Sequence, residues 1–488
     1  MNGRADKGSV QKNKVQKINA CGLTHFRNIN IIVHMPQVKE NKMGTMSVPL
    51  LIVNISLPMM ISMMIQALYN IVDSALVGRI NENALTALSL AFPLQNLMIA
   101  FGVGTAVGVN ALLSTKLGQK KAEDVNKAAM NGLFLAFCNY IFFLLLSFFI
   151  LRPYFVSSAK GVAQIVSYGE DYMHIVMKAS FGLFGVVMLD RLLQATGRTL
   201  FTMISQISGA LCNVVLDFCL IFGLGPFPKL GVAGAAIATV IGQCLSMVLS
   251  LVFNLAFNHD IQFKFRNFKP DFATIRQIYL VAIPTILFNG ATSITTYLLQ
   301  LILGIFSTTA IAVYGVYFKL NSFVFMPVFG LNSGLVPIIA YNYGACKKKR
   351  IFKAVHTGLL FALTIMGFGL LLFELIPGPL LRLFSATDEM LRIGIPAIRI
   401  IAPSFIGAAI SITLSSVFQA FSSAVYSMIV AFMRQLVILL PVAYLLSLTG
   451  NIRNVWFSFL IAEVVSVTFS LLFYMRLRKN KIMPIQEV

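Results

Sequence analysis

Long apolar stretches alternate with polar connections along most of the chain. An apolar stretch of about 20 residues or more is long enough to cross the hydrocarbon core of a bilayer as a helix. Twelve such segments are predicted, at residues 50–78, 85–113, 128–151, 167–189, 201–223, 232–257, 277–304, 309–340, 354–376, 396–420, 424–447 and 454–475. The pattern therefore predicts an all-α integral membrane protein with twelve transmembrane helices.

Composition and charge agree with this interpretation and set the orientation. The 488 residues are 58% hydrophobic and only 11% charged, whereas soluble domains carry about 25% charged residues. Most of the 38 Lys and Arg residues fall in the two tails and in the connections on the same side of the membrane. The positive-inside rule then predicts that both termini are cytoplasmic. Because these basic residues are dispersed over separate loops, the net charge of +21 does not favour a nucleic-acid partner.

The N-terminal segment differs from the rest of the chain. Residues 1–47 are polar and basic and contain no apolar core, so they are not expected to be a cleaved secretory signal. We expect a disordered cytoplasmic tail. Met43 and Met46 would serve equally well as the start of the chain.

The second half of the sequence repeats the first at a nearly constant offset. Chance rarely aligns so many glycines and prolines in this way. The aligned pairs include Pro58 and Pro284, Gly104 and Gly330, Gly108 and Gly334, Gly118 and Gly344 and then, with the offset shortened by one position, Gly182 and Gly407, and Gly225 and Gly450. Six spans per half give both halves the same orientation, related by a pseudo-two-fold axis along the membrane normal, a plan used by secondary transporters. The expected parts are an N-lobe (48–257), a cytoplasmic linker (258–275), a C-lobe (276–478) and a C-terminal tail (479–488).

The repeated glycines are also expected to have a structural role. Small residues four positions apart allow membrane helices to approach closely. Gly104 and Gly108, with their counterparts in the second half, are therefore expected to serve close helix packing.

Some polar residues inside the spans are not repeated, and these are candidates for function. Asp73 aligns with Leu299, Asn213 with Ile438, Asp217 with Val442 and Thr239 with Val464. At about 1.5 Å per residue, Asp73, Asp217 and Thr239 lie about 8–11 Å inside the outer helix ends. Carboxylates within the membrane usually mark ion or proton pathways. We predict that these four polar residues form one coupling site, whose oxygens suit a hard cation or the uptake of a proton.

The first span carries a polar stripe next to this site. Gln66, Tyr69 and Asn70 recur at helical spacing with Asp73 and are candidates for the substrate pathway. An equally good interpretation of these neutral residues is that they satisfy one another inside the bundle.

Other charged residues in the spans are expected to have structural roles as partners between helices. These are Lys178, Lys319, Arg399, Arg434 and Glu463. Asp190 and Arg191 fall near the cytoplasmic end of the fourth span, where we expect water to reach them.

Catalytic signatures are missing from the sequence. It contains no G-x-S-x-G, no H-E-x-x-H and no G-x-x-x-x-G-K-[ST] motif, and its five histidines are scattered. The sequence therefore favours neither an enzyme nor a pump driven directly by ATP, and no cofactor is expected.

Three segments resemble the multidrug and toxic compound extrusion (MATE) family. They are SLPMMISMMIQALYNIVDSALVGRI (56–80), FVFMPVFGLNSGLVPIIAYNYGA (323–345) and NVVLDFCLIFGLG (213–225), the last followed by GVAGAAIAT (231–239). The resemblance runs from about Met43 to about Arg478. Within the family, the sequence is similar to the bacterial MepA-type exporters. It implies two six-helix lobes around a central cavity.

The resemblance also implies a function. It implies an antiporter in the bacterial inner membrane, in which entry of Na⁺ or H⁺ drives export of small organic, often cationic, compounds. Prokaryotic relatives use an aspartate on the first helix, an Asn-xxx-Asp pair on the fifth and a threonine on the sixth. These positions fall on Asp73, Asn213, Asp217 and Thr239, and the first three would hold Na⁺ if Na⁺ is the coupling ion. Spans seven, eight and ten lack Asp and Glu, which departs from relatives that use acids on helices seven and ten.

One alternative stays open within the same superfamily. A lipid-linked saccharide flippase would be expected to show a basic central cavity, and four basic residues within the spans are compatible with it. The acidic set of the N-lobe disfavours it. Apart from substrates, the expected partners are membrane lipids, and we expect the protein to function as a monomer.

Overall fold

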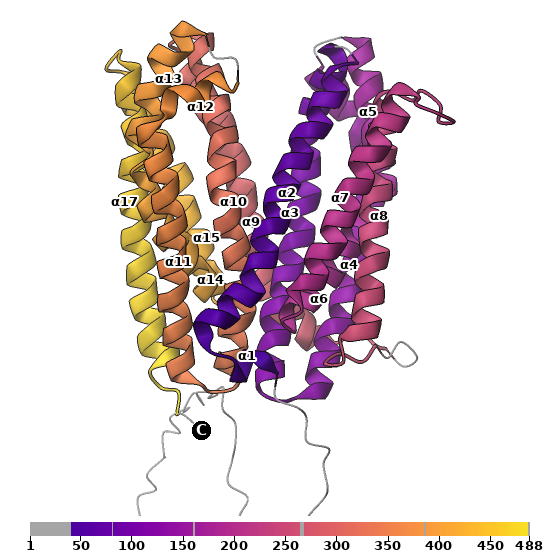
Figure 1. The fold of residues 1–488 in the computed structure, drawn as a ribbon, viewed down its shortest axis with the longest axis vertical. Coiled ribbons are helices and arrows are strands. Elements are labelled where there is room, and N and C mark those ends of the chain that lie inside the picture. Colours follow the sequence, from indigo (N-terminus) through magenta and orange to yellow (C-terminus); the bar gives the residue numbers. More distant parts are fainter. Residues whose placement is uncertain (1–40, 81, 160–161, 264–267, 385–386, 487–488) are drawn as a thin grey trace, which may run out of the picture. The chain divides into compact units, whose positions relative to one another are not determined.

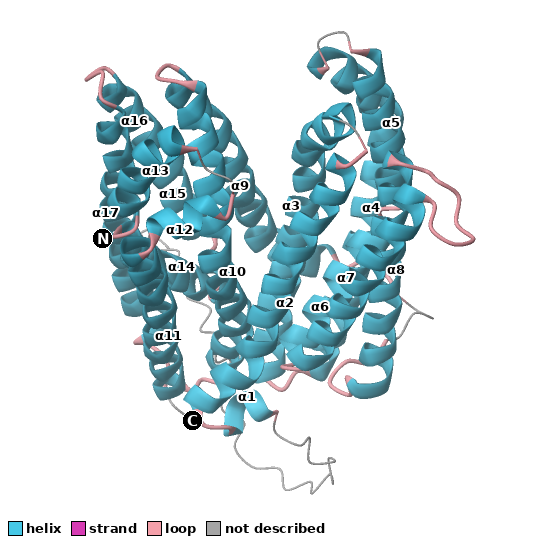
Figure 2. Cartoon of the chain, turned by 45° about the horizontal axis from the view of Figure 1, so that its top comes forward, coloured by secondary structure: helices cyan, strands magenta, loops and turns pink. Residues whose placement is uncertain are grey.

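The computed structural model describes residues 41–80, 82–159, 162–263, 268–384 and 387–486. Within these ranges the regular structure is helical and contains no strand (Figure 2). The described residues belong to one compact unit, Glu40–Val488.

The helices of the first half are α1 (Lys42–Thr45), α2 (Val48–Gly78), α3 (Glu82–Gly118), α4 (Ala122–Ser158), α5 (Ala163–Lys178), α6 (Phe181–Ala195), α7 (Thr199–Phe222) and α8 (Val232–Phe257). The helices of the second half are α9 (Phe272–Gly304), α10 (Thr308–Gly344), α11 (Lys348–Leu375), α12 (Pro377–Arg382), α13 (Asp388–Ile401), α14 (Ser404–Ala420), α15 (Val425–Phe432), α16 (Leu440–Ser447) and α17 (Ile452–Leu477). Two π-helical segments complete the second half, η1 (Met433–Leu439) and η2 (Arg478–Ile482).

The number of membrane spans agrees with the sequence pattern. Among the described residues, ten helical segments are long and apolar enough to cross a membrane, and two bent helix pairs raise the number to twelve. The bent pairs are α5 with α6, at 47°, and α13 with α14, at 50°. Two of the predicted spans, 167–189 and 396–420, are therefore each built from two helices. Pro403 precedes α14 and has no backbone N–H, which explains the second break.

The backbone repeats at the same offsets as the sequence. The two bent pairs begin at Ala163 and Asp388 and end at Ala195 and Ala420, so both ends obey the offset that relates Gly225 to Gly450. Left-handed backbone conformations recur in the same way. The repeated pairs are Lys120 (φ 58°) with Cys346 (φ 56°), Gly197 (φ 81°) with Ser422 (φ 51°), and Gly225 (φ 65°) with Gly450 (φ 69°). The two halves therefore share one fold, including the places where the chain turns.

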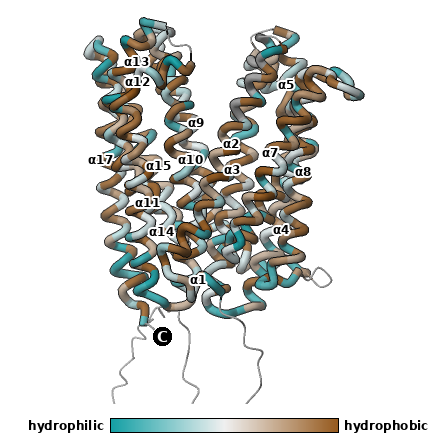
Figure 3. The backbone as a smooth tube through the Cα atoms, viewed as in Figure 1, coloured by the Kyte–Doolittle hydropathy of each residue, from teal (hydrophilic) through white to brown (hydrophobic). Residues whose placement is uncertain are grey.

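The outside of the bundle is apolar over the length of the helices. Large side chains such as Phe149 (75% exposed) and Phe368 (69% exposed) point outward, and hydrophobic residues predominate along the helices in Figure 3. So much exposed apolar surface is stable only against lipid. The chain is therefore a multi-pass membrane protein.

The helices form two lobes, α2–α8 and α9–α17, each with its own hydrophobic core. In Figure 1 the lobes approach each other near α1 and diverge toward α5 on one side and α13 on the other. The first turns of α2, including Leu51 and Ile55, pack into the core of the second lobe. The N-terminal end of α2 therefore belongs to the contact between the lobes.

Repeated glycines form this contact. A methyl group on Gly108 of α3 would lie 2.5 Å from the carbonyl oxygen of Ile278 on α9. In the equivalent place of the repeat, a methyl group on Gly334 of α10 would lie 2.2 Å from Oγ of Ser56 on α2. The expectation of close helix packing is confirmed, and the helices brought together belong to different lobes.

The symmetry is closest where α3 meets α10. A methyl group on Gly118 would lie 2.0 Å from the carbonyl oxygen of Tyr341, and one on Gly344 would lie 2.0 Å from that of Thr115. Thr115 and Tyr341 are themselves related by the repeat. Gly118 of α3 therefore meets Tyr341 of α10, and Gly344 of α10 meets the equivalent residue of α3, Thr115. The pseudo-two-fold axis therefore passes between these two helix ends.

Candidate functional site

The two aspartates predicted for the coupling site are neighbours in the N-lobe. Asp73 is carried by α2 and Asp217 by α7, and their carboxyl groups lie within electrostatic range of each other. Asp217 is fully buried, at 0% exposure. Within the described part of the chain, three of their carboxyl oxygens have no hydrogen-bond partner: Oδ1 of Asp73 and both oxygens of Asp217. Two ionised carboxylates this close repel each other, so the pair requires a cation or a shared proton.

The predicted amide and hydroxyl lie together as well. Asn213 precedes Asp217 by one turn of α7 and is 3% exposed. Its Nδ2 donates to Oγ1 of Thr239 on α8 at 3.4 Å, and its Oδ1 has no partner among the described residues. The amide oxygen is therefore available to a ligand.

A buried tyrosine connects the two pairs. Tyr172 of α5 is 2% exposed, and its hydroxyl accepts a hydrogen bond from Nε2 of Gln95 on α3 at 2.9 Å. The same hydroxyl interacts with the side chain of Thr239 and lies within electrostatic range of Asp73. The site therefore draws on five helices, α2, α3, α5, α7 and α8.

Sequence reasoning missed Tyr172 and Gln95. A signal for the tyrosine was present, because the repeat aligns Tyr172 with Ala397. The glutamine gave a weaker signal, because the repeat aligns it with another polar residue, Asn321.

Of the polar stripe on α2, Tyr69 is the residue that lies near the two aspartates. Tyr69 interacts with the side chain of Gln66 and lies within electrostatic range of Asp73 and Asp217. Gln66 itself is exposed. Asn70 is part of α2, and its side chain lies outside the described residues.

The atoms of this cluster fit a small hard cation. Unpartnered oxygens of Asp73, Asn213 and Asp217 are buried in an apolar lobe. Oxygen ligands of this kind suit a hard metal ion, and the paired carboxyls also suit a proton. When bound, a cation would neutralise the two carboxylates, whereas the chain supplies the oxygens, the exclusion of lipid and the orientation of Asn213 toward Thr239.

The C-lobe does not duplicate the cluster. Its equivalent positions are Leu299, Ile438, Val442 and Val464, and Leu299 is fully buried in the hydrophobic core. The polar set is therefore a property of one lobe.

A buried aspartate elsewhere in the N-lobe corrects the sequence interpretation. We expected Asp190 to lie within reach of water, but it is 2% exposed. Its carboxyl accepts hydrogen bonds from Ser205 (3.1 Å), from Gln206 Nε2 (2.7 Å) and from Ser250. Because α7 and α8 pack against the end of α6, Asp190 is closed to solvent. Ser62 of α2 in turn donates to Gln206, so this network also reaches α2.

The other charged residues within the spans contact residues outside their own helix. Arg434 of η1 and Glu463 of α17 form an ion pair at 3.3 Å. The remaining contacts are Lys178 with the ring of Phe148 (5.5 Å), Lys319 with the ring of Phe384 (6.0 Å), and Arg399 Nε with the carbonyl oxygen of Glu374 (3.3 Å).

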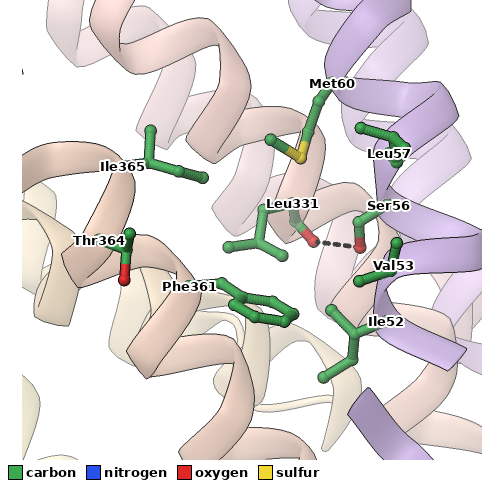
Figure 4. Close-up of a pocket in the computed structure, with 9 residues that line it drawn as sticks. All are labelled: Ile52, Val53, Ser56, Leu57, Met60, Leu331, Phe361, Thr364 and Ile365. Carbon is green, nitrogen blue, oxygen red and sulfur yellow. Dashed lines mark hydrogen bonds between the residues drawn. The ribbon is translucent and has the colours of Figure 1, made fainter. Parts of the chain in front are cut away.

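An apolar pocket of about 230 Å³ lies away from the acids, at the contact between the lobes. Its lining residues come from α2, α10 and α11 and include Leu57, Leu331 and Phe361 (Figure 4). The polar group of Ser56 donates to the carbonyl oxygen of Leu331 at 3.3 Å, as Figure 4 shows. The pocket therefore offers shape and apolar surface but no charge.

Comparison with known proteins places this geometry in a family. The family model MatE matches residues 58–219 and 281–445. The chain is 25% identical over 428 residues to a protein of Staphylococcus haemolyticus named multidrug export protein MepA, covering 87% of this chain and 93% of the relative. It is 24% identical over 417 residues to a protein of Shewanella oneidensis named FAD transporter, covering 85% and 92%.

Solved structures agree on the fold. A structure described as the outward-facing conformation of a multidrug resistance MATE family transporter of the MOP superfamily matches with a TM-score of 0.84 at 22% identity, covering 90% of this chain and 98% of that one. A twelve-helix, two-lobed membrane protein of this kind is a secondary transporter, not an enzyme. The chain belongs to the MATE family, and within it resembles the MepA type.

Proposed function

We propose that the protein exports small organic, mainly cationic, compounds in exchange for Na⁺ or H⁺. The observation that carries this proposal is the proximity of Asp73 and Asp217, because Oδ1 of Asp73 and both carboxyl oxygens of Asp217 are buried without hydrogen-bond partners among the described residues. A site that must hold a cation or a proton, on one lobe only, suits coupling better than packing. In this proposal Asp73, Asn213, Asp217 and Thr239 bind the coupling ion, and Tyr69 and Gln66 lie on the substrate path.

The proposed cycle is alternating access by rocking of the two lobes. The lobes meet near α1 and diverge toward α5 and α13. The connections at the diverging end precede α5 and α13 and are the ones that the positive-inside bias assigns to the outside. With this orientation, the structure is outward-facing and both termini are cytoplasmic. The proposal also includes that the protein lies in the inner membrane of a bacterium and acts as a monomer.

The proposal is tested by transport in proteoliposomes. A cationic dye is followed while Na⁺ and H⁺ gradients are imposed one at a time. We expect one of the two gradients to drive the dye uphill. Dye movement that ignores both gradients would show that the protein is not a cation-coupled exporter.

A second candidate is export of an anionic compound, because one relative is named an FAD transporter. The acid pair of the N-lobe disfavours a dianion, since it would repel negative phosphates. Flavin dinucleotide in the same proteoliposome assay, in place of the dye, decides between the two candidates. The same repulsion argues against a lipid-linked saccharide flippase, whose cargo also carries phosphates.

A further inference from the structure

The C-lobe has a charged pair of its own, Arg434 and Glu463, and Arg434 lies in the middle of a span. Arg434 is part of η1, a π-helical segment between α15 and α16 within the span Val425–Ser447. The equivalent span of the N-lobe, α7, is an uninterrupted α-helix. Single π-helical turns inside α-helices are frequent at functional sites.

Arg434 is the accessible member of its ion pair. The Arg434 side chain is 24% exposed, whereas that of Glu463 is 9% exposed. Both carboxyl oxygens of Glu463 have partners, because Nη1 of Arg434 donates to Oε2 at 3.3 Å and Ser411 donates to Oε1 at 3.1 Å. The carboxylate is therefore saturated and buried, while the guanidinium keeps further donors. A guanidinium has five N–H groups in a planar fork, which suits a carboxylate or phosphate.

The neighbours of the ion pair show which part of the C-lobe it occupies. A charged group at mid-span that is partly exposed faces a watery space rather than lipid. Gln435, the next residue, donates to Thr292 of α9 at 3.2 Å, and Tyr317 of α10 lies within electrostatic range of Arg434 and Glu463. Since α9 and α10 are the helices that contact the N-lobe, the ion pair lies next to the part of the C-lobe that faces the other lobe.

The C-lobe helices on which the pair lies, and α10 beside them, carry unused polar atoms and aromatic rings. Within the described residues, Oε1 of Gln435 and Nε1 of Trp456 are buried without a hydrogen-bond partner. The rings of Tyr317 and Phe459 lie 6.0 Å apart, and those of Trp456 and Phe459 lie 6.4 Å apart. Orphaned donors and acceptors beside aromatic rings are expected of a ligand site, because such groups are otherwise satisfied in a folded protein.

The fold of a lobe does not require the pair. The repeat aligns Arg434 with Gly209 and Glu463 with Ala238. In the N-lobe, a methyl group on Gly209 would lie 1.9 Å from Oγ of Ser246 on α8, so the same helix contact is made by close packing instead. A buried ion pair is in any case weak evidence for a stabilising role.

We infer that Arg434 binds the anionic group of amphoteric organic substrates, with Glu463 holding its guanidinium in place. This inference rests on the proposed function and specifies its substrate class. The acids of the N-lobe would attract the amine of such a compound, and Arg434 its carboxylate, from the opposite lobe. Compounds that carry only a cation would use the N-lobe and the aromatic surfaces.

Two dyes with one scaffold test the inference. Rhodamine 110 carries a free carboxylate beside its cationic ring system, and rhodamine 123 is its methyl ester and carries only the cation. Binding of each to the purified full-length protein is measured by fluorescence anisotropy. Arg434→Gln should weaken rhodamine 110 binding by about tenfold or more, as expected for a lost charge-assisted hydrogen bond. Rhodamine 123 binding should change less than about twofold.

The partner of Arg434 gives a result of opposite sign. Glu463→Gln keeps an oxygen that accepts a hydrogen bond from the guanidinium and removes only its counter-charge, so rhodamine 110 should bind more tightly while rhodamine 123 does not. If the pair is only structural, both variants lose thermal stability and both dyes weaken together, which would overturn the inference. Arg434→Lys keeps the charge without the fork and should bind rhodamine 110 at an intermediate level. It also replaces Arg434→Gln if that variant does not fold.

Failure of this inference and failure of the proposed function are distinguishable. Binding in detergent needs no ion gradient, so it reports on Arg434 alone. Uphill movement of rhodamine 123 in proteoliposomes needs the coupling site and not Arg434. Wild-type protein that does not bind rhodamine 110 at all would also overturn the inference, whatever the transport of rhodamine 123 shows.

Discussion

Asp73 of α2 and Asp217 of α7 lie within electrostatic range of each other inside the N-lobe, and the carboxyl oxygens of Asp217 have no hydrogen-bond partner among the described residues. The helix that carries Asp73 is also the one whose early turns meet Gly334 of α10 in the other lobe. Occupation of the site therefore acts on a helix that belongs to the contact between the lobes. This is a physical route by which an ion could bias the rocking of one lobe against the other.

Neutralising either aspartate should abolish coupling but not folding. Asp73→Asn and Asp217→Asn keep nearly the same volume and remove the mutual repulsion together with the cation site. We expect a dye still to bind and gradient-driven export to be lost. Export in proteoliposomes under separate Na⁺ and H⁺ gradients is the measurement.

Matched changes in the C-lobe serve as the control. Leu299→Asn and Val442→Asn place the same amide at the equivalent positions of the repeat and should not abolish coupling specifically. Wild-type export by both aspartate variants under both gradients would show that the coupling site is elsewhere.

The hydroxyl of Tyr172 should set the affinity of the site. Tyr172→Phe removes the group that accepts from Gln95 and contacts Thr239. Leaving a buried donor unpaired costs about 1–3 kcal/mol. We expect a lower melting temperature and a higher ion concentration for half-maximal export, of roughly tenfold if the loss falls on ion binding.

Tyr314→Phe in the C-lobe is the control for this tyrosine. It removes a buried tyrosine hydroxyl away from the acids and should leave the ion dependence unchanged. An unchanged ion dependence in Tyr172→Phe as well would remove the tyrosine from the site.

Enlarging Gly118 or Gly344 should separate the lobes where they touch. A methyl group at either position would lie 2.0 Å from a backbone carbonyl oxygen, and backbone in a helix cannot yield as a side chain can. We expect Gly118→Ala and Gly344→Ala to shift the distances between spin labels placed on the outer ends of α2 and α9. Gly315→Ala is the control on α10, because nothing lies within 4 Å of that position. Equal distance distributions in all three variants would mean that this contact does not set the lobe angle.

The start of α9 should depend on pH. Asp271 caps this helix, and its carboxyl accepts from the backbone N–H of Thr274 at 3.1 Å and from the Thr274 hydroxyl. These hydrogen bonds hold the pKa of the Asp271 carboxyl below its usual value. The cap is therefore fully formed above the pKa of the unfolded chain and is lost as the pH falls through the lower folded pKa.

Hydrogen exchange measures this cap. The protection factor of the Thr274 amide should decrease at acidic pH in the wild type. Asp271→Asn keeps the acceptor but does not titrate, so its protection should not vary with pH in that range. A wild-type protection factor that stays constant through the acidic range would contradict the role of the carboxylate.

The orientation in the membrane is open to a direct test. The distribution of Lys and Arg predicts that the 258–275 linker is cytoplasmic. A single cysteine introduced at His259, in a background without other cysteines, should react with a membrane-impermeant maleimide only after the cells are opened. Labelling of intact cells at this position would reverse the topology and make the structure inward-facing.

Much of the fold was predictable because its causes are local. Apolar runs of sufficient length have one stable arrangement in lipid, the helix, since every backbone hydrogen bond can then be made within the segment. The internal repeat predicted the equivalence of the halves and the close approach at Gly108 and Gly334. The aspartates were found because a charge is costly in such a run, and Leu299 and Val442 showed that the fold does not need one there.

Other features depended on contacts that no local pattern records. Burial of Asp190 follows from two helices, α7 and α8, that close over the end of α6. The place of Tyr172 follows from the bend between α5 and α6, which sets how α5 faces α3 and α8. Likewise, Arg434 and Glu463 are separated in sequence, and they pair only because η1 and α17 lie side by side. The sequence by itself determined the number of spans, the repeat and the acidic residues, because length and polarity are fixed residue by residue. Which side chains touch was decided by tertiary structure, because it depends on the rotation and tilt of each helix against its neighbours.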